Sequence, residues 1–277
     1  MSRSFVFLVL LAAGSFVRAQ GDEIRDPARS PAISAHRGAS RLAPENTLAA
    51  FSKAIAMGAD FIEVDLRTTS DGREVCLHDA SLKRTTGVDS LVNDMSFERV
   101  RALSAGHKSG PQYENEKIPS LEDVCELVSA HNRSGSRRVR LYLDCKHIRV
   151  DEVLRVLKEY DLLSASVFYG DVMTLLAIRS AAPDARLLPA FPGEEREDEI
   201  IRTLRPIAFD VDWHQVNASL VARCHRKGIK VFCDLLDEND HLSAYRKAIA
   251  MGVDLIQTDD VEAVKKCREE SRNVTPR

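Results

Sequence analysis

Acidic residues alternate with apolar ones in two short stretches of this chain. In residues 61–67, Glu63 and Asp65 would project from one face of a strand while the apolar side chains project from the other. In residues 141–146, the same alternation places Asp144 on a polar face. Polar side chains turned to solvent would explain either strand alone. Three carboxylates brought together would instead repel one another unless a cation compensates them, and all-oxygen ligands favour Mg²⁺ or Ca²⁺ over zinc.

Two histidines lie where they could serve the same site. His36 ends the first apolar run, and His78 ends a short run that follows the first acidic stretch. Cleavage of a phosphodiester bond needs a base for the attacking hydroxyl and an acid for the leaving alkoxide, and imidazole, with a pKa of about 6.5, suits both tasks. A lone histidine is more often structural, but two at strand ends beside a carboxylate pair favour catalysis. Arg37 could grip phosphate oxygens, and Gly38 would permit close approach of the backbone.

These residues would be positioned by strands that alternate with helices. Eight strands are predicted, at residues 32–36, 61–67, 140–146, 166–169, 185–190, 207–212, 230–235 and 254–258. Seven amphipathic helices are predicted between them, at residues 45–57, 121–132, 150–160, 171–181, 197–204, 218–227 and 240–251. Repeated βα units of this kind predict an α/β fold, a (β/α)8 TIM barrel. Because helices cover the outer strand faces of such a barrel, the polar faces are expected to point inward, toward the site end.

A short extra run, residues 74–78, follows the second strand. The Asp71-Gly72 pair between them favours a two-residue turn, so the run is predicted to fold back antiparallel as a hairpin. With the turn centred on that pair, the numbers of paired residues sum to 143, and His78 is predicted to face Asp65 and to project to the same side. Without this hairpin, eight parallel strands remain, which fits a closed barrel.

A long polar segment, residues 82–119, separates the hairpin from the next barrel helix. Long insertions within compact domains are usually functional or mobile. Because the segment leaves from the end of the hairpin near His78, one interpretation is a cap beside the site. The other interpretation is a solvated excursion with no role.

Composition bounds the class of protein. The 277 residues, 44% apolar and 29% charged, suit one large globular domain, predicted over residues 32–277. The formal net charge is −3, and the lysines and arginines are spread along the chain rather than gathered in a basic stripe. Nucleic acid is therefore not an expected partner.

Residues 1–19 have the form of a signal peptide. Arg3 precedes an apolar run at residues 5–17, and Val17-Arg18-Ala19 resembles a small-residue cleavage site. A membrane span would need about 20 apolar residues, more than this run offers, so no stable membrane anchor is expected. The expected location is secreted or periplasmic.

The six cysteines show no spacing typical of a disulfide framework or a zinc site. Most of them fall inside predicted strands and helices. We therefore expect them to be small buried apolar side chains rather than bridges or metal ligands.

Taken together, the motifs of this chain resemble the glycerophosphodiester phosphodiesterase family. The similarity is dense through about residue 87, over H-R-G at 36–38, P-E-N-T-L-A-A-F at 44–51, G-A-D-F-I-E-V-D at 58–65, T-S-D-G at 69–72, H-D at 78–79 and L-K-R-T-T-G at 82–87. It continues more thinly at residues 118–123, 143–146 and 252–259. The order and spacing of these strings carry the resemblance, since no single one would decide it.

The resemblance implies a (β/α)8 barrel that uses one divalent cation, Ca²⁺ or Mg²⁺, to release glycerol 3-phosphate and an alcohol from a small-molecule glycerophosphodiester. Carried over by position, it implies metal ligands at Glu63, Asp65 and Asp144, an acid/base pair at His36 and His78, and phosphate-binding side chains at Arg37 and Lys146. It also places Glu45 and Asn46 near the site, where they would position the groups that touch metal or substrate. An equally open role for these two residues is to start the first helix after Pro44.

Two positions depart from the family pattern. Asp144 stands where the family usually has the longer glutamate, which could change metal distance or preference. Residues 232–235, F-C-D-L, lack the W-T-V-N common near the last strands, so an aromatic contact to the substrate would be missing. Trp213, the only tryptophan, could supply an aromatic wall, although packing is the better explanation for it.

Two alternative functions fit part of the pattern. A phospholipase D-like lyase of the sphingomyelinase D type, acting on lysophospholipids, has a similar barrel and site and an aspartate as third acid, like Asp144. That function calls for an exposed apolar rim, which the polar segment at residues 82–119 does not suggest. A noncatalytic barrel that binds phosphate esters is the other alternative, although binding alone does not require two titrating imidazoles.

Overall fold

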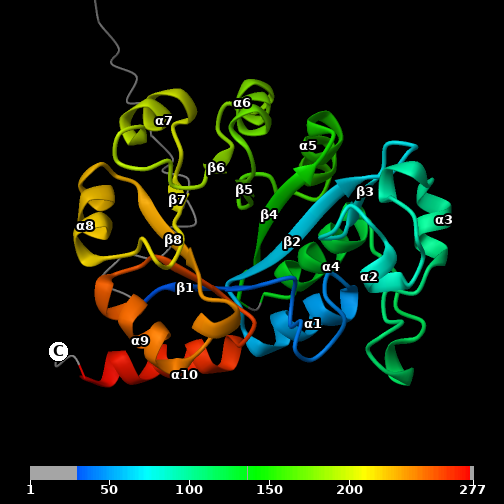
Figure 1. Ribbon diagram of the computed structural model, residues 1–277, viewed down its shortest axis with the longest axis horizontal. Helices are drawn as coiled ribbons and strands as arrows, with labels where there is room; N and C mark the ends of the chain where they lie inside the picture. The colour runs from blue at the N-terminus through cyan, green and yellow to red at the C-terminus, as the bar shows by residue number, and fades with distance from the viewer. Residues whose placement is uncertain (1–29, 136, 275–277) are drawn as a thin grey trace, which may run out of the picture.

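The strands of this chain form a parallel barrel. The computed structural model describes residues 30–135 and 137–274, and its strands neighbour one another in the order β6-β5-β4-β2-β1-β9-β8-β7 (Figure 1). The barrel strands are β1 Ala32–Ala35, β2 Phe61–Thr68, β4 Arg140–His147, β5 Val167–Tyr169, β6 Arg186–Leu188, β7 Ala208–Asp210, β8 Lys230–Asp234 and β9 Leu255–Thr258. Each lies within a residue or two of its predicted position, so the eight predicted barrel strands and the α/β barrel fold are confirmed.

Backbone hydrogen bonds bring β6 and β7, the two ends of this order, together. The Ile207 N–H donates to the Leu187 carbonyl at 3.0 Å, and the Asp210 N–H donates to the Pro189 carbonyl at 3.0 Å. The Phe191 N–H donates in turn to the Asp210 carbonyl at 2.7 Å. The sheet is thereby nearly closed into a barrel, which leaves little unpaired edge.

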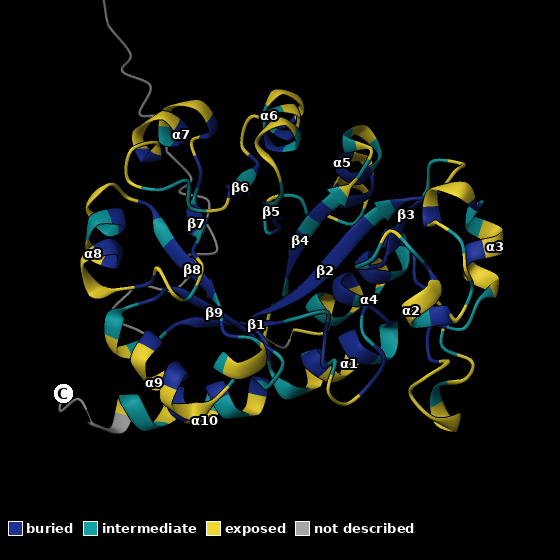
Figure 2. Cartoon of the chain, viewed as in Figure 1, coloured by how far each residue is buried: buried dark blue, intermediate teal, exposed yellow. Residues whose placement is uncertain are grey.

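Eight helices follow or precede these strands and form an outer ring (Figure 1). They are α1 Leu48–Met57, α4 Leu121–Arg133, α5 Val150–Glu159, α6 Val172–Ala181, α7 Glu197–Leu204, α8 Ala218–Arg226, α9 Leu242–Met251 and α10 Val261–Val274. Their exposed residues face outward, while the strands are buried (Figure 2). The seven predicted helices are confirmed, and α10 is an additional helix that the sequence analysis missed. Its buried residues Val261, Val264 and Arg268 recur at helical spacing, which was the available signal.

The barrel interior is filled at its lower level by apolar side chains, one from each strand. They are Ala32, Phe61, Tyr142, Val167, Leu188, Ala208, Phe232 and Leu255. Because side chains alternate along a strand, the residue two positions further on points into the barrel again. From Phe61, Tyr142, Ala208 and Phe232, that next inward position is an acid each time. The apolar layer is therefore a floor, and carboxylates stand above it at the carboxyl ends of the strands.

The hairpin after β2 is present, but its predicted register is wrong by one residue. Strand β3, Glu74–Cys76, pairs antiparallel with β2, and Cys76 lies opposite Leu66. The next backbone bond runs from the Leu77 N–H to the Asp65 carbonyl at 3.0 Å. Leu77, and not His78, is therefore the residue across from Asp65.

The turn explains the shift of register. Its closing pair is Thr69 and Arg73, whose N–H and carbonyl lie 2.9 Å apart, so the loop holds three residues rather than the predicted two. Gly72, the last of the three, has a φ of +83°. A three-residue hairpin loop ends in a residue with this left-handed conformation, a position that favours glycine.

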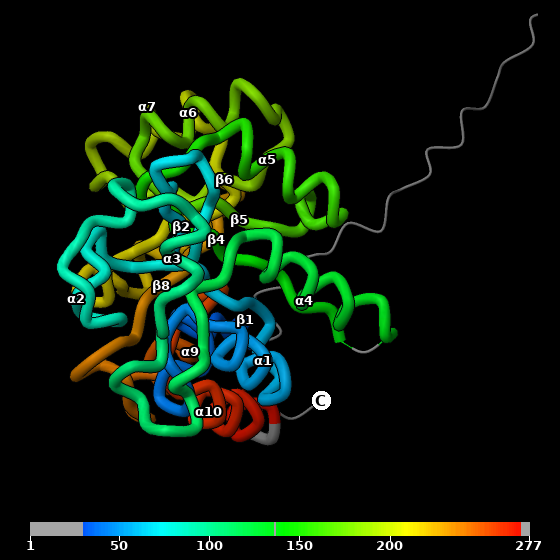
Figure 3. Tube along the Cα trace, turned by 90° about the vertical axis from the view of Figure 1, so that its right-hand side faces the viewer, coloured from blue at the N-terminus to red at the C-terminus, as the bar shows by residue number. Residues whose placement is uncertain are grey.

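The segment at residues 82–119 is folded and lies against the hairpin, on the side that faces the viewer in Figure 3. It contains α2 Lys83–Thr86, α3 Phe97–Ala102 and two short 3₁₀ turns, Val92–Asp94 and Pro111–Tyr113. Together with β3 it encloses a small core of its own, made of Val75, Leu77, Leu82, Val92, Met95, Val100, Ala105 and Ile118. The segment is therefore folded around a core that it shares with β3.

The cysteines are buried and unpaired, as expected for small apolar side chains; they are Cys76, Cys125, Cys145, Cys224, Cys233 and Cys267. The predicted signal peptide, residues 1–19, lies outside the described residues. Within residues 30–135 and 137–274, no helix is both long enough and apolar enough to cross a lipid bilayer.

Candidate active site

The three predicted metal ligands lie together. Asp65 and Asp144 are direct partners in the parallel pairing of β2 with β4, and Glu63 precedes Asp65 on the same face of β2. One oxygen from each of the three carboxylates lies within 4.8 Å of the other two. Glu63 is 2% exposed and Asp65 is 1% exposed, while Asp144 is partly buried at the edge of the cluster.

Burial and mutual repulsion make this cluster a site for a cation. Burial, followed by the charges of Asp65 and Asp144, raises the pKa of Glu63 well above its usual range. Burial also raises the pKa of Asp144, although Lys146 works in the opposite direction. A divalent cation would relieve this repulsion, and a set of three carboxylates provides the oxygen ligands that Ca²⁺ and Mg²⁺ prefer. The residues present therefore fit the predicted metal.

Asn46 holds one of these carboxylates in place. Its amide nitrogen donates to Asp65 Oδ2 at 2.8 Å, and its amide oxygen accepts from the Asp65 N–H at 3.2 Å. Asn46 is 3% exposed and has a φ of +55°, outside any helix. Helix α1 begins at Leu48 with Thr47 as its N-cap, so the alternative role of Glu45 and Asn46 in starting the helix is wrong.

The two predicted phosphate-binding cations stand beside the acids. The Lys146 ammonium lies 2.5 Å from Asp144 Oδ2 and 3.3 Å from Asp65 Oδ1. The side-chain Nε of Arg37 lies 3.4 Å from Asp65 Oδ2, and the backbone N–H of Arg37 donates to Glu63 Oε2 at 2.7 Å. A phosphate bound at the acid cluster would therefore meet positive charge from both side chains.

Gly38 is required for packing in this structure. A Cβ at this position would lie 2.7 Å from the carbonyl carbon of Ala50 in α1, and the φ of Gly38 is +81°. The glycine thus lets helix α1 approach the end of β1. The expected reason, close approach of the backbone to a ligand, is not needed to explain it.

His36 is oriented by a carboxylate from the neighbouring strand end. Its Nδ1 lies 2.9 Å from Asp259 Oδ1, and the Ser40 hydroxyl donates to the same oxygen at 2.9 Å. Burial opposes ionisation of Asp259, but the hydrogen bond and charge of His36 and the bond from Ser40 outweigh it and lower the pKa of that carboxyl. No role was predicted for Asp259 from the sequence, although it follows the last strand as His36 follows the first.

His78 is oriented in the same way by its own neighbour. Its Nδ1 lies 2.7 Å from Asp79 Oδ1, and Arg84 Nε donates to Asp79 Oδ2 at 2.7 Å. The hydrogen bond from Arg84, with help from His78, lowers the pKa of Asp79 to about 2. The guanidinium of Arg67 donates twice to the His78 carbonyl, at 2.8 and 2.7 Å, and so fixes the backbone.

The inserted segment reaches the site through Arg84. From α2, Arg84 also donates to both oxygens of Glu45, at 2.6 and 2.7 Å, and Glu45 accepts from Arg37 at 3.2 Å. Glu45 therefore connects the insertion, through Arg84, with the loop after β1, through Arg37. Residues 82–87 belong to the motifs that carry the family resemblance, but no role of Arg84 was predicted from the sequence.

Both imidazoles lie near acids of the barrel mouth. Burial raises the pKa of Asp144 and that of Asp234, at the end of β8, while the neighbouring His78 opposes this effect at Asp144 and the neighbouring His36 opposes it at Asp234. The structure thus brings the nine predicted site residues to the carboxyl ends of β1, β2 and β4 and the segments that follow them. A site at this end is where barrels of this type bind substrates.

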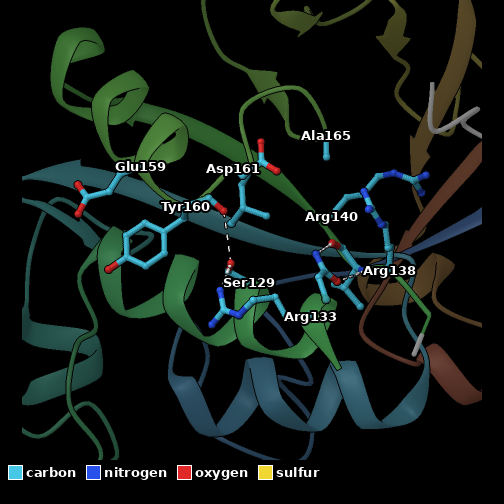
Figure 4. A pocket seen from close by; sticks show the side chains of 11 residues that line it. Ser129, Arg133, Arg138, Arg140, Glu159, Tyr160, Asp161 and Ala165 are labelled. Carbon is cyan, nitrogen blue, oxygen red and sulfur yellow. Dashed lines mark hydrogen bonds between the residues drawn. The ribbon is translucent and has the colours of Figure 1, made fainter. Parts of the chain in front are cut away.

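Figure 4 shows a cleft at the amino-terminal end of β4. Its lining comes from the end of α4, the start of β4 and the segment between α5 and β5, and includes Arg133, Arg140 and Asp161. It contains none of the predicted site residues. Since it lies at the amino-terminal end of β4, where barrel residues usually serve stability, we do not place the chemistry there.

Comparison with known proteins gives one family. The model of the glycerophosphoryl diester phosphodiesterase family matches residues 36–263. A glycerophosphodiester phosphodiesterase of Caldanaerobacter subterraneus subsp. tengcongensis is 29% identical over 234 residues, which cover 84% of this chain and 95% of that protein. A relative from Bacillus subtilis is 31% identical over 238 residues, which cover 82% of this chain and 93% of the relative.

Solved structures with the same fold carry similar descriptions. The crystal structure of a glycerophosphodiester phosphodiesterase from Thermotoga maritima is 25% identical with a TM-score of 0.67, over 86% of this chain and 98% of that one. A phosphodiesterase from Oleispira antarctica, in complex with the product sn-glycerol-3-phosphate, is 24% identical with a TM-score of 0.76, over 87% and 97% of the two chains.

Proposed function

The chain belongs to the glycerophosphoryl diester phosphodiesterase family, and from this premise we propose that it hydrolyses glycerophosphodiesters to glycerol 3-phosphate and an alcohol. We propose further that the reaction depends on one divalent cation, Ca²⁺ or Mg²⁺, and on His36 and His78 as its acid/base pair. The observation that carries this proposal is the convergence of Glu63, Asp65 and Asp144 within 4.8 Å of one another. Two imidazoles, each held by a carboxylate, stand at the same mouth.

Each imidazole is prepared for proton transfer by its hydrogen bond. Because Nδ1 of His36 is bound to Asp259 and Nδ1 of His78 is bound to Asp79, the Nε2 atom of each ring is left to face the substrate. One ring takes the proton of the attacking hydroxyl, and the other gives a proton to the oxygen of the departing alcohol.

The charges around the acids would hold the phosphate. A cation held by Glu63, Asp65 and Asp144 would supply positive charge to the nonbridging phosphate oxygens when bound. Arg37 and Lys146, which lie against the same carboxylates, would bind these oxygens from the protein side. The cation, Arg37 and Lys146 would also stabilise the negative charge that develops on the phosphate oxygens in the transition state.

Phosphorus NMR of glycerophosphocholine incubated with the enzyme tests the reaction. We expect glycerol 3-phosphate to form, EDTA to abolish turnover, and His36→Ala or His78→Ala to lower the rate by at least about 10²-fold. His107→Ala, at an exposed histidine of the insertion, is the matched control and should keep the wild-type rate. Full activity in either site variant would refute the assignment of the acid/base pair.

The metal can be tested without turnover. A ligand that binds only the folded chain at 100 times its Kd stabilises it by about 2.7 kcal/mol. We therefore expect Ca²⁺ or Mg²⁺ to raise the melting temperature of the wild type but not that of Asp65→Asn. Equal behaviour of the two proteins would argue against this metal site.

Phosphorus NMR of a second incubation, with lysophosphatidylcholine in place of glycerophosphocholine, separates the alternatives. A lyase of the sphingomyelinase D type would consume lysophosphatidylcholine and form a cyclic phosphate, while a binding protein would leave both substrates intact.

We also propose export directed by residues 1–19. Sequencing of the amino terminus of the protein recovered outside the cell, with a start at Gln20, would support this; retention inside the cell with residues 1–19 intact would contradict it.

A further inference from the structure

The carboxylate of Asp240, in the segment between β8 and α9, is fully buried and accepts four hydrogen bonds. Its Oδ1 accepts from the Tyr245 hydroxyl and, at 2.6 Å, from the Thr258 hydroxyl. Its Oδ2 accepts from the guanidinium of Arg41 at 2.6 Å and from the backbone N–H of Asp259 at 3.2 Å. A buried carboxylate with two donors on each oxygen needs no further partner.

These donors come from three separate parts of the barrel mouth. Arg41 lies in the loop between β1 and α1, and Tyr245 lies in α9, where it is 0% exposed. Thr258 is the last residue of β9, and Asp259 follows it. Asp240 therefore fixes the end of β9 against α9 and against the loop after β1.

The start of α9 does not require this carboxylate. The N-cap of α9 is His241, whose Nδ1 accepts from the Ala244 N–H at 3.3 Å. The four hydrogen bonds of Asp240 therefore serve the packing of the mouth and not the capping of the helix.

The end of β9 is the part of the chain that holds His36. The backbone N–H of His36 donates to the Thr258 carbonyl at 3.0 Å, and its Nδ1 lies 2.9 Å from Asp259 Oδ1. Asp240 is bonded to these same two residues, to the hydroxyl of Thr258 and to the backbone N–H of Asp259. The position of the imidazole thus depends on a strand end that Asp240 fixes.

A small movement of this strand end would matter for proton transfer. Without the Asp240 carboxylate, the Asp259 N–H loses its acceptor, and a backbone group that loses its acceptor moves to find another partner or water. Asp259 would carry the His36 ring with it. A displacement of about 1 Å in a reacting group can lower the rate by about 10²-fold.

We propose that Asp240 is a positioning residue of the reaction, which fixes Asp259 so that Asp259 holds the Nε2 atom of His36 toward the substrate. This inference rests on the proposed function, because it concerns the same acid/base pair. The acid cluster lies on other strands, β2 and β4. Loss of Asp240 should therefore lower kcat and leave KM nearly unchanged.

Steady-state rates on glycerophosphocholine test the proposal. We expect Asp240→Ala to lower kcat by at least about tenfold and to change KM by less than about twofold. Asp240→Asn keeps the shape and one acceptor oxygen, and the hydroxyls of Tyr245 and Thr258 can turn to accept from its amide. Its kcat should therefore stay within about threefold of the wild-type value.

Asp254 provides the matched control, because it precedes β9 at the opposite end of the same strand. Its carboxylate is also buried, accepts from the Val231 N–H at 2.8 Å and lies 2.8 Å from His225 Nε2. Asp254→Ala should keep the wild-type kcat. A fall in kcat as large as that of Asp240→Ala would mean that general destabilisation causes both losses, which overturns the positioning role.

A double variant tests the path through Asp259. If Asp240 acts through Asp259, Asp240→Ala should lower kcat by less than about twofold further when Asp259→Asn is already present. Losses that multiply in the double variant would overturn the proposal, as would a wild-type kcat in Asp240→Ala alone.

The outcomes separate the two levels of inference. A wild type that cleaves no glycerophosphodiester refutes the proposed function, whereas an active wild type with an unaffected Asp240→Ala refutes only the positioning role. Should Asp240→Ala fail to fold, Thr258→Val removes one of the two bonds between Asp240 and the end of β9 while keeping the shape of the side chain. A fall in kcat of at least about threefold in Thr258→Val supports the proposal, and an unchanged kcat overturns it.

Discussion

Replacement of Asn46 separates the two ways in which this residue supports the acid cluster. Its side chain makes two hydrogen bonds to Asp65, at 2.8 and 3.2 Å, and its backbone has the left-handed φ of +55°. Asn46→Gly removes the hydrogen bonds but tolerates this φ. Asn46→Ala removes the same bonds and adds strain, because a Cβ is disfavoured there.

The structure sets the size of each effect. A buried donor or acceptor left without a partner costs about 1–3 kcal/mol, so Asn46→Gly should lower the free energy of unfolding by about that amount. Asn46→Ala should lower the free energy of unfolding by roughly 1 kcal/mol more than Asn46→Gly. The backbone strain of alanine is partly offset, because the unfolded alanine variant has less conformational entropy than the unfolded glycine variant. Because Asn46 orients a predicted metal ligand, both variants should bind Ca²⁺ about 10–100-fold more weakly.

Urea unfolding without metal, together with calorimetric titration of Ca²⁺, measures both quantities. Asp161 provides the control, since it is exposed and has a φ of +57° far from the acid cluster. The difference between Asp161→Ala and Asp161→Gly gives the backbone contribution alone, with Ca²⁺ affinity unchanged. If Asn46→Gly keeps both the stability and the Ca²⁺ affinity of the wild type, the hydrogen bonds to Asp65 do not order the site, and the reasoning fails.

Two further predictions concern carboxylates. Asp259→Asn and Asp79→Asn keep the size of the side chain but remove the negative charge that holds each imidazole. We therefore expect kcat to fall by about 10–100-fold and the pH profile of kcat to shift, as measured by steady-state rates from pH 5 to 9. An unchanged pH profile would contradict the role of both residues. Burial raises the pKa of Glu74 from 4.5 to about 7. Between these two pH values Glu74 is protonated in the folded chain and ionised in the unfolded chain. The free energy of unfolding therefore falls as the pH rises from 4.5 to about 7. Glu74→Gln should remove this dependence of the free energy of unfolding on pH, which is at most about 1.4 kcal/mol per pH unit. Urea unfolding at several pH values measures it, and an unchanged dependence in the variant would contradict the prediction.

Local pattern was enough to predict the frame of the site. The alternation in residues 61–67 placed Glu63 and Asp65 on one face, since the side-chain period of a strand is a local property. The βα order predicted a barrel, and equal strand directions brought Asp144 beside Asp65. The hairpin shows the limit of such reasoning, because one additional turn residue at the Gly72 turn moved Leu77 into the place predicted for His78.

Tertiary structure alone decided which distant residues meet. His36 and Asp259 are 223 positions apart, and they meet because closure of the barrel places β1 next to β9. Arg84 reaches Asp79 and Glu45 because the inserted segment folds back over the hairpin. Sequence therefore determined the strand faces that carry the acids, because the alternation of side chains is set by neighbouring residues. The partners of those side chains depend on how the ends of the chain and the insertion pack in space, which no local pattern encodes.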